Sequence, residues 1–324
     1  MRNLIFKICV LVFTIFVIFA EGCCSKKSKD SIAIRPVRLA YIPYSADLPF
    51  FVAKEKGYFK DLGFKIEGVP CRSTSEAMDL VLAGKADGAM GNSFSVLFSI
   101  HAKNADTIRL INVSVESSEN DSFTGFVLVA PDANIDLPRN LKGKKVGTEM
   151  GASQVLWVKL YLKNLGLDPE RDVTIEQESP EILLNALHAK QLDAVFVFEP
   201  YATVGLVKGL AKKLDPFFRK AIINPFPAGG ATLSRDFCRK NPLAAEKIIQ
   251  ALDRAIEFIN QKPIEAKESL MKYIPLDKET ALRSQIYRWW DSSAILIDPI
   301  QKLADIMTDN GELASKINVS TMIR

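Results

Sequence analysis

Short polar side chains recur where predicted strands end and predicted helices begin. Those of the first half are Tyr44-Ser45, Arg72-Ser73-Thr74 and Asn92-Ser93, and those of the second half are Gly151-Ala152-Ser153 and Glu199-Pro200-Tyr201. In open parallel sheets, ligands bind at the carboxyl ends of strands, where helix N-termini present free N–H groups. Each such residue is also a preferred helix cap. Five of these turns facing one cleft nevertheless predict a small-molecule binding site.

Glu199 is the most informative of these residues, because a carboxylate beside a cleft is costly to desolvate without a cation or a donor. It could pair with Arg72, accept a hydrogen bond from a ligand amine or ring N–H, or simply place charge at a helix N-terminus. Tyr44 and Tyr201 could stack on a planar ligand or only wall the cleft.

Nothing in the sequence points to catalysis or metal binding. The two histidines, His101 and His188, are far apart and have no metal-ligand spacing. Cys71 and Cys238 lack a CxxC partner, and they could form one disulfide or remain free thiols. We therefore expect no catalytic residue, no cofactor and no metal site.

The elements that position these turns alternate between strand and helix. Apolar runs predict strands at 37–42, 65–69, 86–90, 107–115, 126–130, 145–147, 173–175 and 194–198. The segments that read as helices between them are 48–59, 74–83, 93–101, 153–165, 180–189 and 201–206. This order predicts two tandem α/β units, each an open, mostly parallel sheet with helices on both faces.

The last third of the chain, after Leu233, reads as a helical extension. Asn241 and Pro242 form a favourable helix start, and the apolar stripe Ile248, Leu252, Ala255 and Ile259 predicts a core-facing helix. Further helices are expected near 263–273, 278–289 and 298–310. Helix packing is preferred for Trp289-Trp290 over the alternative, a cage around a ligand.

Composition fits a globular protein. The 324 residues include 42 Lys+Arg against 38 Asp+Glu, with 48% hydrophobic residues, which excludes a disordered chain. The net charge of +4 is small and spread along the chain, so it gives no reason to expect nucleic-acid binding. The length suits two lobes better than one.

The first 24 residues are typical of an export signal. Arg2 and Lys7 give a basic start, and the apolar run over 8–20 is too short for a spanning helix of about 20 residues. The following Gly22-Cys23 resembles a bacterial lipoprotein cleavage site, with Cys23 as the acylated N-terminus. We expect a lipoprotein signal peptide over 1–22 and a polar tether over 23–36. An ordinary signal peptide cut nearby and an uncleaved anchor are the alternatives.

Several segments together resemble one family. Segment 48–60 resembles the signature helix of the NMT1-like ABC-transporter solute-binding proteins for nitrate, sulfonates, taurine and thiamine precursors. Segment 141–147, with Gly151 and Ser153 soon after, resembles the segment with which members of that family enter their second lobe. Segment 192–201 resembles the motif that closes the second lobe of the family. Segment 234–237 and Asn241-Pro242 resemble its C-terminal part. The order and spacing of these motifs make the resemblance specific.

This resemblance implies a bilobed periplasmic-binding-protein fold of type II with two chain crossovers. Lobe 1 would comprise 37–123 plus 227–324, and lobe 2 would comprise 124–226. The binding residues carried by the turns and crossovers would be Tyr44, Ser45, Arg72, Ser73, Thr74, Asn92, Ser93, Thr124, Gly151, Ser153, Glu199, Tyr201 and Gly229.

The resemblance also implies an exported monomer that closes on a solute and delivers it to the permease and ATPase of an ABC importer. An N-terminal lipid would anchor it to the membrane, facing the periplasm or the cell exterior. The solute would be a sulfonate-like or nitrate-like anion, or a pyrimidine-like heterocycle; Glu199 and the tyrosines favour a neutral or cationic heterocycle or an amine-bearing sulfonate.

Two other functions fit the same fold. One is a ligand-sensing protein that signals to a membrane sensor. The other is a pyrimidine-synthesis enzyme, which would need a reactive histidine, a cofactor lysine and a cysteine-rich motif. The positions of His101 and His188 make a general acid or base hard to assign.

Overall fold

The computed structural model describes residues 35–119, 122–216 and 218–323, without the side chains of Asp61, Ala152 and Ser153. The expected signal peptide, Cys23 and most of the tether therefore lie outside the described residues. Across the described ranges, no helix combines the length and hydropathy that crossing a membrane requires. The same ranges contain no group of His, Cys, Asp and Glu arranged to hold a metal ion.

A seven-stranded sheet forms the first lobe. Its strands run in the order β12 (Arg288–Trp290), β5 (Val113–Glu116), β11 (Phe226–Ser234), β3 (Gly88–Ser93), β1 (Val37–Tyr41) and β2 (Ile66–Pro70), and β4 (Ile108–Leu110) also pairs with β11. We call this sheet and the helices packed on it lobe 1. Its strands come from two separate parts of the chain, residues 37–116 and residues 226–290.

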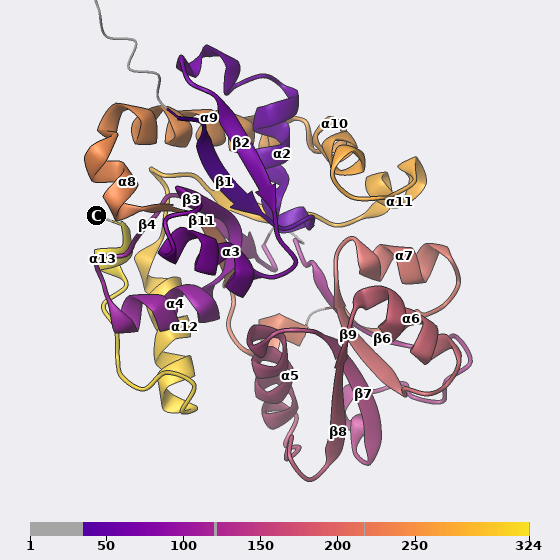
Figure 1. Ribbon diagram of the computed structural model, residues 1–324. Coiled ribbons are helices and arrows are strands. Elements are labelled where there is room, and N and C mark those ends of the chain that lie inside the picture. Colours follow the sequence, from indigo (N-terminus) through magenta and orange to yellow (C-terminus); the bar gives the residue numbers. More distant parts are fainter. Residues whose placement is uncertain (1–34, 120–121, 217, 324) are drawn as a thin grey trace, which may run out of the picture. The chain divides into compact units, whose positions relative to one another are not determined.

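A five-stranded sheet forms the second lobe. Its strand order is β10 (Lys212–Asp215), β6 (Gly125–Val129), β9 (Ala194–Phe198), β7 (Lys144–Glu149) and β8 (Val173–Glu178). Helices α5 (Ala152–Asn164), α6 (Pro180–His188) and α7 (Tyr201–Val207) pack on it, and we call the whole lobe 2 (Figure 1). The α/β bilobed fold is confirmed, while the boundaries at 123/124 and 226/227 stay a prediction.

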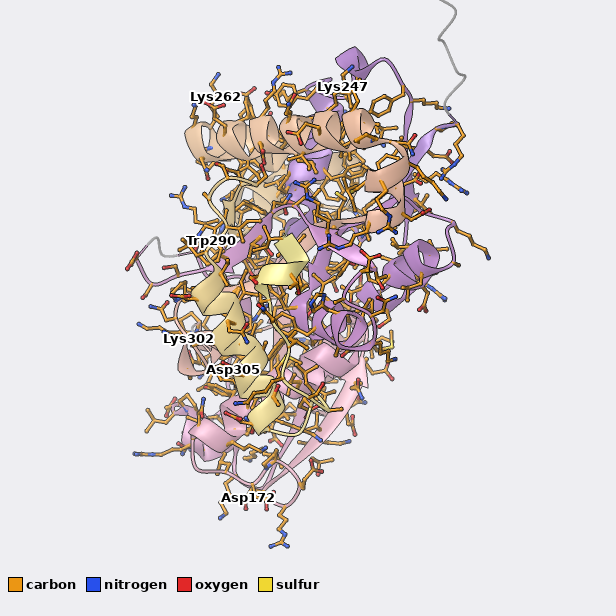
Figure 2. All side chains as sticks on the ribbon, turned by 90° about the vertical axis from the view of Figure 1, so that its left-hand side faces the viewer. Asp172, Lys247, Lys262, Trp290, Lys302 and Asp305 are labelled. Atoms are coloured by element: carbon orange, nitrogen blue, oxygen red, sulfur yellow. The ribbon has the colours of Figure 1, made fainter. Side chains whose placement is uncertain are left out.

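Lobe 1 carries most of the helices in the described part of the chain. They are α2 (Leu48–Glu55), α3 (Thr74–Leu82), α4 (Phe94–Lys103), α8 (Arg235–Lys240), α9 (Pro242–Gln261), α10 (Pro263–Lys267), α11 (Lys278–Arg283), α12 (Ile297–Asp309) and α13 (Ser320–Ile323). Helix α2 packs against α9, whereas α3, α4 and α12 pack against strands. The predicted stripe from Ile248 to Ile259 is fully buried in α9, whereas Lys262 at the C-cap of α9 and Lys302 on α12 are exposed (Figure 2).

Both sheets are mixed rather than mostly parallel. β1 pairs in parallel with β2 and β3, and β7 does so with β8 and β9, because crossover helices join these strands. β6 and β11 enter their sheets directly from the other lobe, and both pair antiparallel with their neighbours. The alternation of strand and helix predicted the elements but carried no information on the direction of these two strands.

Other differences concern element bounds. The expected strand over 107–115 is divided into β4 and β5, and the expected helix over 48–59 ends its α-helical part at Glu55. The helix expected over 278–289 was wrong in its second half, since 288–290 is strand β12 paired with β5. Trp289 is buried and Arg288 exposed, which is the two-residue alternation of a strand.

The two chain connections between the lobes lie side by side. One runs from β5 to β6, and the other reaches β11 through the 3-10 helix η4 (Phe218–Ala221). The Asn224 side chain accepts a hydrogen bond from the Ser118 N–H at 3.1 Å and donates one to Ser118 Oγ at 2.8 Å. Cys71 and Cys238 are free thiols, the first buried and the second partly buried, so they do not pair.

Candidate functional site

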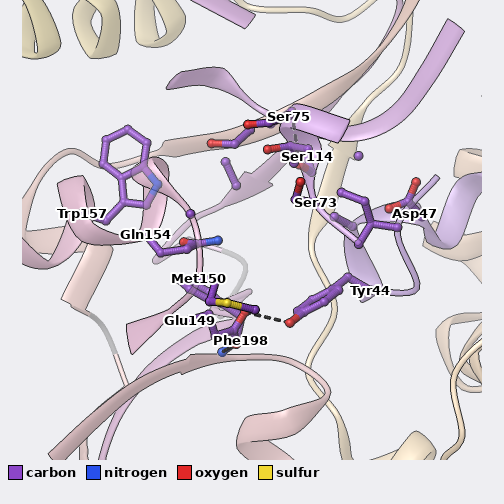
Figure 3. A pocket seen from close by; sticks show the side chains of 18 of the residues that line it. Tyr44, Asp47, Ser73, Ser75, Ser114, Glu149, Met150, Gln154, Trp157 and Phe198 are labelled. Carbon is purple, nitrogen blue, oxygen red and sulfur yellow. Dashed lines mark hydrogen bonds between the residues drawn. The ribbon is translucent and has the colours of Figure 1, made fainter. Parts of the chain in front are cut away.

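A cavity of about 130 Å³ lies between the two sheets and is walled by both lobes (Figure 3). The contributions of lobe 1 include Tyr44, Ser73 to Ser75 at the start of α3, Ser93, Ser114, Gly229 and Tyr287. Lobe 2 contributes Glu149 to Gly151, Gln154 and Trp157 from α5, Phe198 and Arg219. The small volume suits a compact solute, because pockets for drug-sized ligands are several times larger.

Seven of the residues predicted from the sequence line this cavity. They are Tyr44, Arg72, Ser73, Thr74, Ser93, Gly151 and Gly229. Gly229 contributes backbone where β11 runs closest to β3, since a Cβ there would lie 2.1 Å from the Asn92 carbonyl oxygen. Ser73 caps α3 by accepting a hydrogen bond from the Glu76 N–H, so its hydroxyl also serves the helix.

The other predicted residues lie behind the wall. Ser45 is 1% exposed and donates a 3.2 Å hydrogen bond to the Glu199 carbonyl oxygen. Thr124 is fully buried and donates to Glu116. Asn92 is also fully buried, because it points away from its neighbour Ser93 on the same strand. The ring of Tyr201 packs on that of Tyr44 at 5.6 Å. The side chain of Ser153 is outside the described residues.

Glu199 does not line the cavity. Its Oε1 accepts hydrogen bonds from the Thr203 hydroxyl at 2.8 Å and the Gln285 N–H at 3.0 Å, and its Oε2 accepts one from the Thr203 N–H. Burial raises the pKa of Glu199 to about 7, although these donors oppose the shift. Because Gln285 belongs to lobe 1, Glu199 connects the lobes; its contact with a solute stays a prediction.

Glu149 is the principal wall residue that the sequence analysis missed. Its Oε2 accepts a 2.8 Å hydrogen bond from the Tyr44 hydroxyl, which Figure 3 shows across the cavity, and its Oε1 accepts one from the Phe198 N–H at 2.9 Å. Burial raises the pKa of Glu149 to about 7. Its position was predictable in principle, because it lies two residues before Gly151, in the turn that the sequence analysis recognised.

Asp47 is a second acidic wall residue that was missed. It is 1% exposed, and burial raises its pKa well above the ordinary value, against a smaller lowering by the Ile42 backbone N–H. Neither carboxylate oxygen makes a hydrogen bond of normal geometry within the described residues. Gly91 leaves space for this side chain, since a Cβ there would lie 2.5 Å from Asp47 Oδ2. Nothing local in the sequence distinguished it from a charge at the start of α2.

Arg219 brings a cation to the same wall. Its guanidinium lies 3.5 Å from the Glu116 carboxylate, with both side chains almost fully buried, and 4.2 Å from the centre of the Phe198 ring. The Thr124 N–H and hydroxyl also donate to Glu116. No sequence signal indicated Arg219, because η4 is a short segment between β10 and β11.

The mixed sheets, the two crossovers and a cavity walled by both lobes define a protein of the periplasmic-binding-protein fold. The chain belongs to the NMT1-like family, whose model matches residues 32–274.

Similar proteins include both enzymes and binding proteins. The 4-amino-5-hydroxymethyl-2-methylpyrimidine phosphate synthase THI13 of Saccharomyces cerevisiae is 26% identical over 73% of this chain and 70% of its own. A candidate aliphatic sulfonates-binding protein of Bacillus subtilis is 26% identical over 97% of this chain and 93% of its own. The periplasmic aliphatic sulphonate binding protein SsuA of Escherichia coli superposes with a TM-score of 0.71 and 18% identity, covering 89% of this chain and 92% of SsuA.

Proposed function

We propose that this chain is an exported solute-binding protein that holds a small polar molecule between its lobes and passes it to an ABC importer. The observation that carries this proposal is that one cavity takes its walls from both lobes. A solute in contact with both lobes favours the closed arrangement over an open one, because only the closed arrangement offers both sets of contacts. The similarity to the Bacillus sulfonates-binding protein over nearly the whole chain supports the same function.

The two adjacent connections between the lobes would serve as the hinge. They are short, and the mutual hydrogen bonds of Ser118 and Asn224 hold them together, so a rotation about this pair changes few backbone angles. The thirteen turn and crossover residues named from the sequence remain the proposed binding set, and Glu149, Asp47 and Arg219 are added to it.

Enzymatic activity is the competing function, and the similarity to the yeast synthase favours it. The described residues that line the cavity include no histidine and no lysine, and His101 is buried beside Thr321 in lobe 1. The pyrimidine-synthesis enzyme would need a reactive histidine and a cofactor lysine in the cleft, so binding without transformation accounts better for this wall, although Glu149 with its raised pKa is a group that could transfer a proton. Incubation of purified protein with a bound compound, followed by mass spectrometry of that compound, separates the two functions.

We also propose that Cys23 carries lipid and anchors the mature chain, a monomer, to the cell membrane. Support comes only from the sequence around Gly22-Cys23. Mass spectrometry of the mature N-terminus tests it, and an unmodified N-terminus contradicts it.

A thermal-shift screen of oxyanions, sulfonates and pyrimidines tests the binding function. A true solute stabilises the folded protein by mass action, by about 2.7 kcal/mol at a hundredfold excess over its dissociation constant. A gene neighbourhood with a permease rather than a kinase would separate transport from ligand sensing.

A further inference from the structure

A buried ion pair joins the two crossovers between the lobes. Glu116 is the last residue of β5, where the first crossover begins, and Arg219 belongs to η4, where the second crossover begins. Their side chains are almost fully buried, and Arg219 Nη1 lies 3.5 Å from Glu116 Oε1. The pair therefore links the two chain connections about which the lobes would rotate.

Glu116 is fixed to lobe 1 by its strand and to lobe 2 by its carboxylate. Its backbone is paired with that of Phe226 across the antiparallel strands β5 and β11. Its Oε1 accepts hydrogen bonds from the Thr124 N–H at 3.1 Å and from the Thr124 hydroxyl at 2.5 Å. The Thr124 carbonyl in turn accepts one from the Glu199 N–H of lobe 2 at 2.8 Å.

The segment that carries Arg219 is fixed to lobe 2. Its neighbour Phe218 is fully buried, and the Phe218 ring packs at 5.4 to 5.9 Å against those of Tyr161, Phe196 and Phe198. We call these four rings the lobe 2 ring cluster. The Asn164 side chain on α5 also donates a 2.6 Å hydrogen bond to the Ala221 carbonyl. Helix η4 thus moves with lobe 2.

The guanidinium of Arg219 lies among rings of both lobes. It is 4.2 Å from the centre of the Phe198 ring in lobe 2 and 5.1 Å from that of Phe226 in lobe 1. A cation over an aromatic face is attracted to it, more strongly when both are removed from water. The planar guanidinium suits this position better than an ammonium group would. Arg219 therefore contacts both lobes without any solute.

Building on the proposed function, we propose that Arg219 is a positioning residue of the hinge. It holds Glu116 and Phe226 of lobe 1 against the lobe 2 ring cluster, and so restricts the solute-free lobes to a narrow range of angles. Residues between the crossovers move least when the lobes rotate, so these contacts persist during opening. A narrow range raises the fraction of molecules able to close on a solute, and apparent affinity scales with that fraction.

Distances between spin labels on the two lobes test this inference in the solute-free protein. Double electron–electron resonance would use labels at Lys302 on α12 and at Arg171 in lobe 2, which are both exposed. Figure 2 shows the neighbouring Asp172 at the end of lobe 2 away from lobe 1, so a small rotation displaces this label strongly. The labelled chain is the mature protein with serine in place of its own cysteines, Cys23, Cys24, Cys71 and Cys238.

The variant Glu116→Gln/Arg219→Met removes both charges together, so neither remains buried without a partner. Its distance distribution should be about twofold wider than that of the wild type, because the lobes then sample more angles. The matched control Asp253→Asn/Ser292→Ala removes a 2.6 Å hydrogen bond within lobe 1 and should leave the width unchanged. A folded double variant with the wild-type width, or an equal broadening in the control, overturns the inference.

Arg219→Lys is a milder second variant. A Lys ammonium can still pair with Glu116 but cannot stack flat on the rings, so the distribution should broaden by a smaller factor than in the double variant. Circular dichroism establishes that each protein is folded. A wild-type width in folded Arg219→Lys also overturns the inference.

Hydrogen exchange of the unlabelled protein separates hinge control from general stability. Amides of the second crossover, residues 222–224, should exchange about tenfold faster in the double variant, whereas those of β7 and α9 within the lobes should not change. Equal acceleration in all three segments would show a loss of overall stability and would overturn the inference. These measurements need no solute. If no compound in the wider screen shortens the interlobe distance of the wild type, the proposed function fails and the hinge role of Arg219 stands.

Discussion

The Tyr44 hydroxyl donates a 2.8 Å hydrogen bond to Glu149 Oε2, although the two residues lie in different lobes and 105 positions apart. The phenol ring of Tyr44 packs on Tyr201 of lobe 2 as well, at 5.6 Å between ring centres. Both contacts require that the lobes lie close together. Tyr44 therefore links the state of the hinge to the wall of the cavity.

Replacement of Tyr44 by Phe should weaken solute affinity about tenfold. The ring and its packing remain, but a buried hydrogen bond worth about 1–2 kcal/mol is lost, and Glu149 Oε2 loses its donor. Calorimetric titration of both proteins measures the change. Tyr161→Phe is the matched control, since that hydroxyl donates to Asp215 Oδ2 at 2.6 Å within lobe 2 and does not line the cavity. Similar losses in the two variants would contradict the role of the interlobe bond.

Replacement of Glu199 by Ala should lower both solute affinity and melting temperature. The change leaves the Gln285 N–H and the Thr203 N–H without their acceptor, at a cost of about 1–3 kcal/mol for each buried donor. Small-angle scattering should also show less compaction with a confirmed ligand, because the Gln285 contact joins the lobes. Unchanged affinity would show that Glu199 acts on neither the solute nor closure.

The folded protein should become less stable to unfolding as the pH rises from about 5 to 7.5. Glu149 and Glu199 have pKa values raised to about 7 by burial, above an ordinary 4.5. The folded state therefore binds more protons than the unfolded state across this window, and each group contributes at most about 3 kcal/mol. His101 has the opposite effect on stability. Burial lowers its pKa, so the folded protein loses stability from this group as the pH falls below 6.5.

Differential scanning fluorimetry across this window measures the effect. Glu149→Gln and Glu199→Gln should each flatten the pH dependence, and His101→Asn should not. A wild-type protein whose melting temperature rises steadily from pH 5 to 7.5 would contradict the buried location of these acids.

Replacement of Arg219 by Met should be strongly destabilising, by about 3–5 kcal/mol, because it leaves the buried Glu116 carboxylate without its cation. The double variant Glu116→Gln/Arg219→Met should recover most of this loss, since the Gln amide oxygen can still accept from Thr124. Urea unfolding measures both. A double variant as unstable as the single one would show that the ion pair does not determine the cost.

Elements with strong periodicity were predictable from the sequence, as were the turns that face the cavity. The stripe of α9 is buried as predicted, and the polar turns at Tyr44, Ser73 and Ser93 do reach one cavity. These features depend on short-range patterns, namely apolar spacing and the polar caps that follow strands.

The parts that were missed depend on contacts between distant segments. Strand β12 exists because Trp289 pairs with Ser114 of β5, and nothing within 278–290 reveals that partner. Glu199 was expected on the wall, but its carboxylate accepts hydrogen bonds from Thr203, four positions away, and from the Gln285 N–H, 86 positions away. The acidity of the wall depends on Glu149 and Asp47, whose surroundings come from distant segments: Tyr44 of lobe 1 bonds Glu149, and Gly91 of β3 lies against Asp47.

A crystal structure of the mature protein with the first compound identified by thermal shift tests the central claim most directly. We predict electron density for the intact compound in the cavity, in contact with Glu149 of lobe 2 and with Tyr44 or Ser93 of lobe 1. Density for the compound on another surface, or for a chemically altered product in the cavity, would contradict the account.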